Sequence, residues 1–200
     1  MKLYLSPTSP FARKVKVAIL EKDLGGRTEW VMLDPWTNPE TLLALNPLSQ
    51  VPTLVTDDGT VLVGSESILG ALEMLHPEPA LFPAGRSACL DTLAIAGLAH
   101  GLIECGVTIL LERRRPAAQQ STKSIERKQS ATIRTLKKLA ERFDYSSGNF
   151  YLDGIGLACA LAWFDFRLPD FKWRDKHPAL ADWLDEVARR ASMRASAPPA

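Results

Sequence analysis

Cysteine is scarce in this 200-residue sequence, and its placement argues against two kinds of site. The three cysteines, Cys89, Cys105 and Cys159, lie in apolar, helix-like surroundings, and none belongs to a Cys-x-x-Cys pair. We therefore expect neither a disulfide framework nor a metal site. No cysteine precedes Cys89, so the first part of the chain has no thiol of its own for redox chemistry.

An excess of one charge and a long uninterrupted apolar run are also missing. With 24 Lys and Arg against 23 Asp and Glu, the formal net charge is +1, which suggests no nucleic-acid or membrane-surface partner. The most apolar long stretch, 94–111, is interrupted by His100 and Glu104 and is read as a buried helix rather than a membrane span. The first residues resemble a strand, not the apolar centre of a signal peptide. We expect a soluble cytoplasmic protein.

The stretch from Ser6 to Val15 is the most informative part of the chain. An apolar-alternating strand at 2–5 precedes it, and a helix over 10–24 follows, with Pro10 suited to the first turn. Ser9 then stands at the N-cap, where unpaired N–H groups and the helix dipole stabilise an anion. Arg13 follows four residues later, so hydroxyl, dipole and guanidinium are expected to converge. Taken alone, a Ser-Pro pair before a helix is more often a simple cap.

The rest of the first half predicts a small mixed sheet with helices. Strands are expected at 28–33, 50–55 and 60–63, with a hairpin turn at 57–59 joining the last two. A short helix capped by Asn38 should run to residue 45, and another should span 67–75. A helix between early strands implies a parallel crossover, and the hairpin adds antiparallel strands. This order is expected of a thioredoxin-like α/β domain over 1–78.

Beyond a proline-rich linker at 76–85, the strand signals vanish. Helices are predicted at 87–113, 121–143, 152–167 and 178–191, giving an all-α bundle over 86–200 whose tail, 195–200, looks unstructured. The cations at 113–115 are best explained as complements to a helix C-terminus. His100 and Glu104 lie one turn apart on an apolar helix, and burying them would require partners.

Several motifs taken together resemble the glutathione S-transferases. They are Ser9-Pro-Phe-Ala-Arg-Lys-Val15, Asn46-Pro47, Val51-Pro52 and Glu66-Ser67, followed by a helical domain. The segments 115–121 and 178–183 resemble the bacterial YibF-like subgroup in particular. The resemblance implies a thioredoxin-like domain plus a helical domain, glutathione as co-substrate without a metal, an electrophilic small molecule as second substrate, and a homodimer.

The resemblance also implies a role for each site residue. A cis proline after Val51 would leave the main chain at Gln50 and Val51 free to pair with the ligand's cysteinyl backbone. Ser67 would hold the γ-glutamyl carboxylate at a helix start, and Glu66 would pair with the ligand's ammonium. Without the resemblance, Glu66-Ser67 would be read as an ordinary acidic first turn.

In this reading Ser9 stabilises the glutathione thiolate and is not itself a nucleophile. A thiol with a pKa of about 8.5 is only slightly ionised at neutral pH. Lowering that pKa by about two units needs roughly 2.7 kcal/mol. A hydrogen bond to a charged group supplies about 1.5–3 kcal/mol, and a helix N-terminus about 0.3–1 kcal/mol more. No catalytic histidine is required, and the thiolate would attack an electrophile.

Two alternatives stay open from the sequence. One is a non-catalytic interaction protein of the same fold, like the stringent-starvation regulators, although retention of Ser9, Glu66 and Ser67 together argues against it. The other is glutathione-dependent disulfide reduction, which would have to pass between two glutathiones because position 9 is serine. The sequence departs from the family at 151–154, where a Ser/Thr-Leu-Ala-Asp capping box is usual, and at His100, where relatives tend to have Asp.

Overall fold

The computed structural model describes residues 1–145 and 148–199 and divides the chain into two compact units. Unit 1 comprises Met1–Leu81 together with Arg190–Ala200, and unit 2 comprises Phe82–Arg189. Residues 190–199 thus associate with the N-terminal unit, whereas the sequence placed them with the helical one.

Unit 1 is built on a four-stranded mixed sheet with the order β2-β1-β3-β4. Its strands are β1 (Lys2–Leu5), β2 (Glu29–Met32), β3 (Thr53–Val55) and β4 (Val61–Val63). β1 and β2 are parallel, and β1–β3 and β3–β4 are antiparallel. The predicted crossover and hairpin are therefore confirmed, although β3 begins three residues later than expected.

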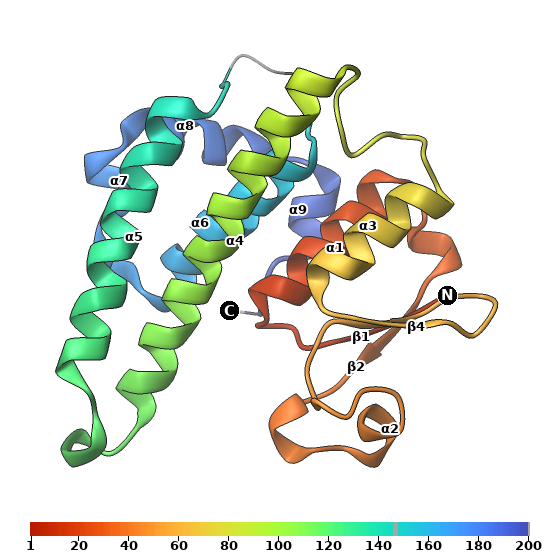
Figure 1. Cartoon of the computed structure of the whole chain (residues 1–200), viewed down its shortest axis with the longest axis horizontal. Helices are drawn as coiled ribbons and strands as arrows, with labels where there is room; N and C mark the ends of the chain where they lie inside the picture. The colour runs from red at the N-terminus through yellow and green to blue at the C-terminus, as the bar shows by residue number, and fades with distance from the viewer. Residues whose placement is uncertain (146–147, 200) are drawn as a thin grey trace. The chain divides into compact units, whose positions relative to one another are not determined.

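Helices cover the sheet of unit 1. α1 (Pro10–Glu21) and α3 (Ser65–Leu75) lie side by side on one face, and α2 (Glu40–Leu43) lies beyond the other (Figure 1). Apolar side chains from the central strands and the two long helices are fully buried between them, including Leu3, Ile19, Leu54 and Ile68. Short 3-10 helices at Gly25–Arg27 and Pro35–Thr37 precede β2 and α2.

Two predicted helix starts are wrong in detail. Asn38 does not cap α2; it ends the Pro35–Thr37 turn in a left-handed conformation with φ of 48°, and Pro39 occupies the N-cap. α3 begins at Ser65 rather than Ser67, preceded by Gly64 at φ of 83°, a backbone conformation that favours glycine. Glu66 and Ser67 consequently lie in the first turn of α3.

The C-terminal segment packs against α1 as far as Ser196, so the expectation of an unstructured tail is wrong at 195 and 196, whereas 197–199 have no helix or strand, as expected. α9 (Ala191–Ala195) packs on α1, and Met193 and Ser196 are buried. Arg190 donates to both carboxylate oxygens of Glu21 at 3.0 and 2.6 Å, and the Ser192 hydroxyl donates to the same group.

Unit 2 has helices and no strands among its described residues, as predicted. Its helices are α4 (Arg86–Arg114), α5 (Thr122–Arg142), α6 (Leu152–Arg167), α7 (Trp173–Lys176) and α8 (Pro178–Val187), with 3-10 helices at Ala117–Gln119 and Pro169–Phe171. α4 packs against both α5 and α6, and α4 and α5 lie side by side in Figure 1. By length and composition alone α4 could cross a membrane, a criterion that the core helix of a soluble protein also meets.

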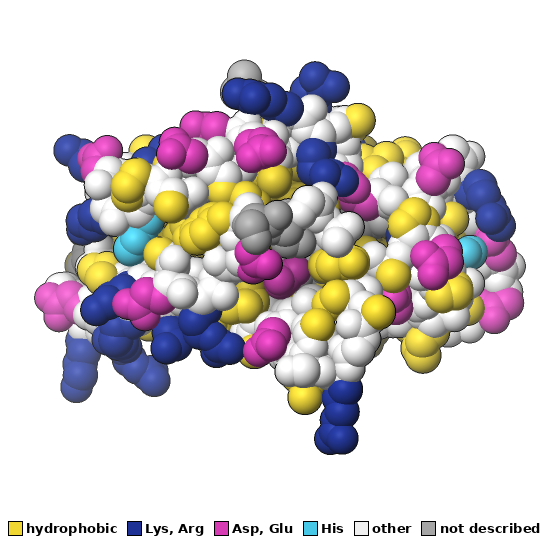
Figure 2. All heavy atoms as spheres, turned by 90° about the horizontal axis from the view of Figure 1, so that it is seen from above, with side chains coloured by type: hydrophobic (Ala, Val, Ile, Leu, Met, Phe, Trp, Pro, Cys, Tyr) yellow, Lys and Arg dark blue, Asp and Glu magenta, His cyan; other side chains and the backbone are white. Residues whose placement is uncertain are grey.

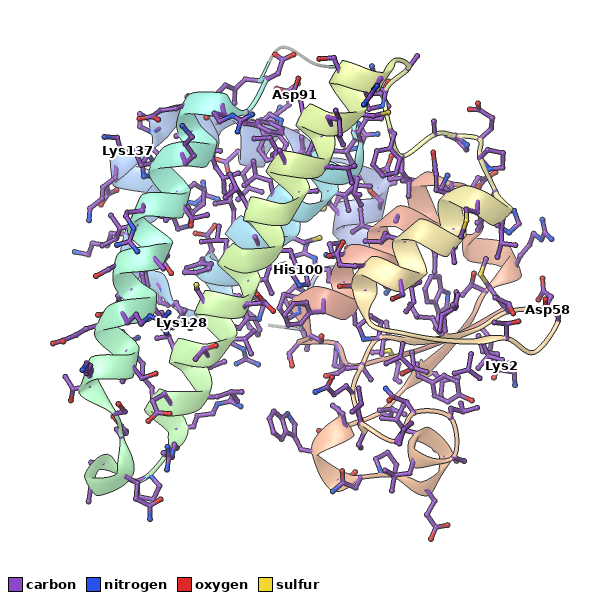
Figure 3. All side chains as sticks on the ribbon, in the orientation of Figure 1. Lys2, Asp58, Asp91, His100, Lys128 and Lys137 are labelled. Carbon is purple, nitrogen blue, oxygen red and sulfur yellow. The ribbon has the colours of Figure 1, made fainter. Side chains whose placement is uncertain are left out.

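The charged surface agrees with the balanced composition. Lys and Arg side chains are interspersed with Asp and Glu over the face seen in Figure 2. Lys128 and Lys137 both belong to α5 (Figure 3), and Arg142 near the end of that helix pairs with Asp91 of α4 at 3.6 Å. The basic residues of α5 are therefore partly paired within unit 2.

His100 lies on α4 (Figure 3). Its Nε2 lies 3.7 Å from Oε1 of Glu104, one turn further along the same helix. Glu104 is 59% exposed. Each of the two side chains therefore has a partner on its own helix, and Glu104 is open to solvent. Neither side chain needs a residue of a second subunit as its partner.

α6 begins without the usual capping box. Tyr151 is its N-cap and makes no side-chain capping bond, but Asp153 Oδ1 accepts from the Gly154 N–H at 2.8 Å. Burial raises the pKa of the Asp153 carboxyl, and the Gly154 hydrogen bond only partly offsets it. The carboxylate thus takes one orphan N–H of the first turn. Residues 146 and 147 of the altered approach to this helix lie outside the described residues.

Candidate functional site

Strand register brings three loops of unit 1 to one edge of the sheet. Antiparallel pairing sets Tyr4 near the end of β1 opposite Thr53 at the start of β3, and Thr53 opposite Val63 at the end of β4. The loop after β1, the loop before β3 and the loop after β4 are therefore neighbours. α1 and α3 both begin from this edge, so two helix N-termini with positive dipole ends lie together there.

Ser9 is the N-cap of α1. Its backbone is extended, with φ of −78° and ψ of 120°, and its Oγ accepts a hydrogen bond from the Ala12 N–H at 3.2 Å. Pro10 fills the first helical position, where no N–H is needed. The cap uses the hydroxyl oxygen as an acceptor, so the hydroxyl proton can still be donated to an anion at the helix mouth. Ser9 is half-buried.

Arg13 does not join Ser9, contrary to the sequence-based expectation. Its guanidinium donates from an Nη atom to the Met193 carbonyl at 3.2 Å and from Nε to Ser196 Oγ at 3.4 Å. Residues four apart on a helix share a face, but the long arginine side chain extends to the C-terminal segment of unit 1 instead. The positive charge therefore fastens α9 rather than stabilising an anion beside Ser9.

The loop before β3 carries the predicted main-chain binding residues. The Val51-Pro52 peptide bond is cis, and Gln50 is exposed. Among the described residues, none makes a backbone hydrogen bond with Val51, so its N–H and C=O are available to pair with an extended ligand.

Asn46 fixes the shape of this loop from beneath. Its fully buried amide donates to the Gln50 carbonyl at 2.9 Å and to Thr53 Oγ1 at 3.0 Å, and its Oδ1 accepts from the Leu48 N–H at 3.0 Å. Asn46, which in the sequence follows the end of a predicted helix, thus also holds the two ends of the binding loop together.

Glu66 and Ser67 are presented at the start of α3. The Gly64 N–H donates to the Pro52 carbonyl at 3.2 Å, which ties this helix start to the cis-proline loop. Both residues are exposed, and the first N–H groups of the helix have no intrahelical acceptor. An incoming carboxylate can be bound there by the N–H groups and the Ser67 hydroxyl.

Sequence reasoning missed Lys14. Its side chain is only 3% exposed and its Nζ donates to Glu66 Oε1, joining α1 to the first turn of α3. In the sequence it is one more cation of a charged helix. Its position one residue before the apolar Val15, beside the apolar stripe of the helix, was the one feature of the sequence that could have indicated its burial.

The described residues contain no group of three or more His, Cys, Asp and Glu side chains that could hold a metal ion. The geometry of unit 1 supports instead the binding of an extended ligand with anionic groups. Main-chain groups of the cis-proline loop lie between two helix N-termini, each of which carries a serine hydroxyl.

Comparisons with known proteins agree with this geometry. Residues 8–75 match the N-terminal domain of glutathione S-transferases, and residues 122–186 match their C-terminal domain. The chain is 31% identical to the uncharacterised GST-like protein YibF of Escherichia coli over 202 residues, covering all of this chain and 99% of that protein.

Solved structures of similar proteins contain glutathione compounds. A glutathione transferase family member from Pseudomonas fluorescens with bound glutathione superposes with a TM-score of 0.92 at 33% identity, covering 100% of this chain and 99% of that one. A glutathione S-transferase from Methylobacterium radiotolerans in complex with glutathione sulfonate gives 0.93 at 30% identity, covering 100% and 95%. The chain belongs to the glutathione S-transferase family.

Proposed function

We propose that this protein is a glutathione transferase of the cytoplasm that activates the glutathione thiol with Ser9 for attack on an electrophilic small molecule. The observation that carries the proposal is the geometry of Ser9. Its Oγ accepts from the Ala12 N–H at the mouth of α1, which orients the hydroxyl and leaves its proton for the thiolate. Bound glutathione in a similar solved structure supports the choice of ligand.

Activation by Ser9 needs no general base. The hydroxyl hydrogen bond to sulfur contributes about 1.5–3 kcal/mol, and the helix dipole about 0.3–1 kcal/mol. Their sum covers the roughly 2.7 kcal/mol that lowers a thiol pKa by about two units. The thiol proton leaves to solvent, and the sulfur forms a bond to the electrophilic carbon. In a substitution that carbon expels its leaving group with the bonding electron pair; in an addition to a double bond the displaced electron pair takes up a proton from solvent. Because Arg13 is engaged at the C-terminal segment, it is assigned no part in this step.

Binding draws on the other residues of the sheet edge. The cysteinyl backbone of glutathione pairs with the Val51 main chain in the loop that includes Gln50. The γ-glutamyl carboxylate lies at the start of α3 with Ser67, and the ammonium pairs with Glu66. Glu66→Ala and Ser67→Ala should each weaken glutathione binding by about 1–3 kcal/mol. Unchanged affinity in both variants, measured by calorimetric titration, would remove these residues from the site.

The thiolate absorbance of bound glutathione, followed against pH, tests the mechanism. Ser9→Ala should raise the pKa of the bound thiol and slow conjugation at neutral pH roughly ten- to a hundredfold, with recovery as pH rises. Its glutathione affinity should barely change, because the two charged ends of the ligand dominate binding. Thr8→Ala is the matched control, since Thr8 is the neighbouring hydroxyl and does not cap α1.

Two outcomes contradict the Ser9 assignment. If only the Thr8 variant moves the titration, Thr8 is the activating hydroxyl. If neither variant moves it, the helix dipole alone activates the thiol. Assaying a chloroaromatic substrate beside a model disulfide then identifies the reaction class, because disulfide reduction by a protein with serine at position 9 would need two glutathiones.

We also propose that the protein is a homodimer. α4 exposes Leu90 and Leu93, at 56% and 50%, one turn apart on the surface of unit 2. An apolar stripe of this kind on a long helix is suited to pack against a second copy. Sedimentation should give a dimer, and Leu90→Glu with Leu93→Glu should shift it to monomer. A concentration-independent monomer in the unmodified protein would refute the proposal.

A further inference from the structure

Two lysines of unit 1 are buried in the same way, and both reach from α1 or its end to a glutamate of α3. Lys14 Nζ donates to Glu66 Oε1, and Lys22 Nζ donates to Glu73 Oε2 at 2.7 Å. Their side chains are 3% and 0% exposed. A buried ammonium needs an anionic partner, so both pairs contribute to the packing of α1 on α3.

The two pairs differ in what surrounds the carboxylate. Glu73 is 22% exposed and also accepts from the Leu81 N–H at 3.0 Å, while Lys22 donates further to the carbonyls of His76 and Pro79. The ammonium of that pair is fully buried, and both members have further hydrogen-bond partners within the protein. Glu66 is 52% exposed and lies in the first turn of α3, so the Lys14 pair opens to solvent at the candidate site.

We propose that Lys14 is a positioning residue that fixes the Glu66 carboxylate for recognition of the substrate's free α-ammonium group. The inference rests on the proposed function. An exposed glutamate has three side-chain torsions and would otherwise sample many orientations. The buried ammonium holds one carboxylate oxygen from beneath. An ionised carboxylate has about four acceptor positions, so it can hold Lys14 and a ligand ammonium together.

The positions of Lys14 and Glu66 connect this pair to the two ends of the proposed binding site. Lys14 lies five residues beyond Ser9 on α1, and Glu66 lies next to Ser67 on α3. The contact therefore links the helix that carries the thiol-activating hydroxyl to the helix that binds the γ-glutamyl end. The protein should in consequence prefer ligands that keep the α-ammonium over otherwise identical ligands that lack it.

The preference can be measured with two ligands, glutathione and its deaminated analogue glutaryl-cysteinyl-glycine. Titration calorimetry gives the ratio of their dissociation constants for the unmodified protein, Lys14→Met, Lys14→Arg, Glu66→Gln and the Lys14→Met/Glu66→Gln double variant. Lys22→Met is the matched control, because it removes an equally buried lysine from the other Lys–Glu pair. Lys14→Gln replaces Lys14→Met if the latter is too unstable to titrate.

We expect the unmodified protein to favour glutathione by about tenfold or more, as a charged hydrogen bond implies. Lys14→Met should bring the ratio close to one by weakening glutathione alone, with the analogue's affinity changed less than about twofold. The double variant should match Glu66→Gln, because Lys14 acts through Glu66. Lys14→Arg should recover most of the preference, and Lys22→Met should lower the melting temperature while keeping the ratio.

The inference is wrong if Lys14→Met keeps the preference for glutathione over the deaminated analogue. It is also wrong if Lys14→Met increases that preference, which would show that Lys14 competes with the ligand for Glu66. Additive effects of Lys14→Met and Glu66→Gln overturn it too. These results leave the proposed function standing if the unmodified protein binds glutathione. If the unmodified protein binds neither ligand, the proposed function fails and this inference fails with it.

Discussion

Replacing Lys22 by methionine tests how the linker after α3 is held. Lys22 follows the last residue of α1, and its fully buried ammonium donates to Glu73 and to the carbonyls of His76 and Pro79, each at 2.7 Å. Lys22 thus donates hydrogen bonds both to α3 and to the segment that follows α3 in the chain. Methionine matches the length of the lysine stem, so the change removes charge and hydrogen bonds while leaving little cavity.

The expected loss is large because one partner of a buried pair is removed. Such changes cost about 3–5 kcal/mol when the remaining charge stays buried. Glu73 keeps the Leu81 N–H and is 22% exposed, so solvent recovers part of the cost. We expect Lys22→Met to lower the free energy of unfolding by about 3 kcal/mol, measured by urea denaturation at fixed pH with the m-value checked for two-state behaviour.

A second variant separates the lost hydrogen bonds from the unpaired charge. Glu73→Gln keeps an oxygen acceptor for Leu81, and combining it with Lys22→Met removes the stranded carboxylate. The double variant should therefore be more stable than Lys22→Met alone. A cost below about 1 kcal/mol for Lys22→Met, or a double variant that is less stable than both singles, would show that this pair behaves like an exposed one.

Two further substitutions test the binding loop and the helical unit. Asn46→Ala removes three hydrogen bonds of a fully buried amide, so it should lower the free energy of unfolding by about 2–3 kcal/mol and weaken glutathione binding. Thermal unfolding measures the first effect and titration calorimetry the second. Normal glutathione affinity would mean that the loop keeps its shape without Asn46. Gly106→Ala would place a Cβ 2.6 Å from the Trp163 ring and 2.9 Å from Phe164, so unfolding should show a loss of about 1–3 kcal/mol. Gly101→Ala in the same helix meets no such neighbour and should instead stabilise by up to about 1 kcal/mol.

Local patterns in the sequence predicted the elements that depend on nearby residues. The apolar stripe of α1, the Pro10 start and the hairpin before β4 are short-range features, and each lies within a few residues of its expected place. The cap by Ser9 is also local, because Oγ and the Ala12 N–H are three residues apart. The cis bond at Val51 was expected only from the family resemblance, since few X-Pro bonds are cis.

Contacts between distant residues could not be predicted in this way. Arg13 was assigned to Ser9 because they share a helix face, yet its partners Met193 and Ser196 lie at the other end of the chain. Lys14 would ordinarily be assigned to solvent, but its buried ammonium pairs with Glu66 on a neighbouring helix. Charged side chains are long, so their partners are set by tertiary packing rather than by spacing along the chain.

The docking of the C-terminal segment on α1 leads to a prediction about pH. Burial acts to raise the pKa of the Glu21 carboxyl, but hydrogen bonds from Arg190 and Ser192 and the Arg190 charge outweigh it, so its pKa lies below the ordinary 4.5. The unfolded chain then binds a proton at Glu21 more readily than the folded chain does. Its contribution to stability is complete above the unfolded pKa and is lost as pH falls through the folded value.

The difference in unfolding free energy between the unmodified protein and Glu21→Gln isolates this contribution, because the other carboxyls are common to both proteins. We expect the difference to be constant near neutral pH and to shrink steadily as the pH falls below about 4.5, the ordinary glutamate value. Arg190→Ala should remove most of the pH dependence by removing the cation that lowers the pKa. A difference that stays constant or grows with acid would mean that Glu21 is not held by Arg190 in solution, and that α9 is attached to α1 mainly by the buried side chain of Met193.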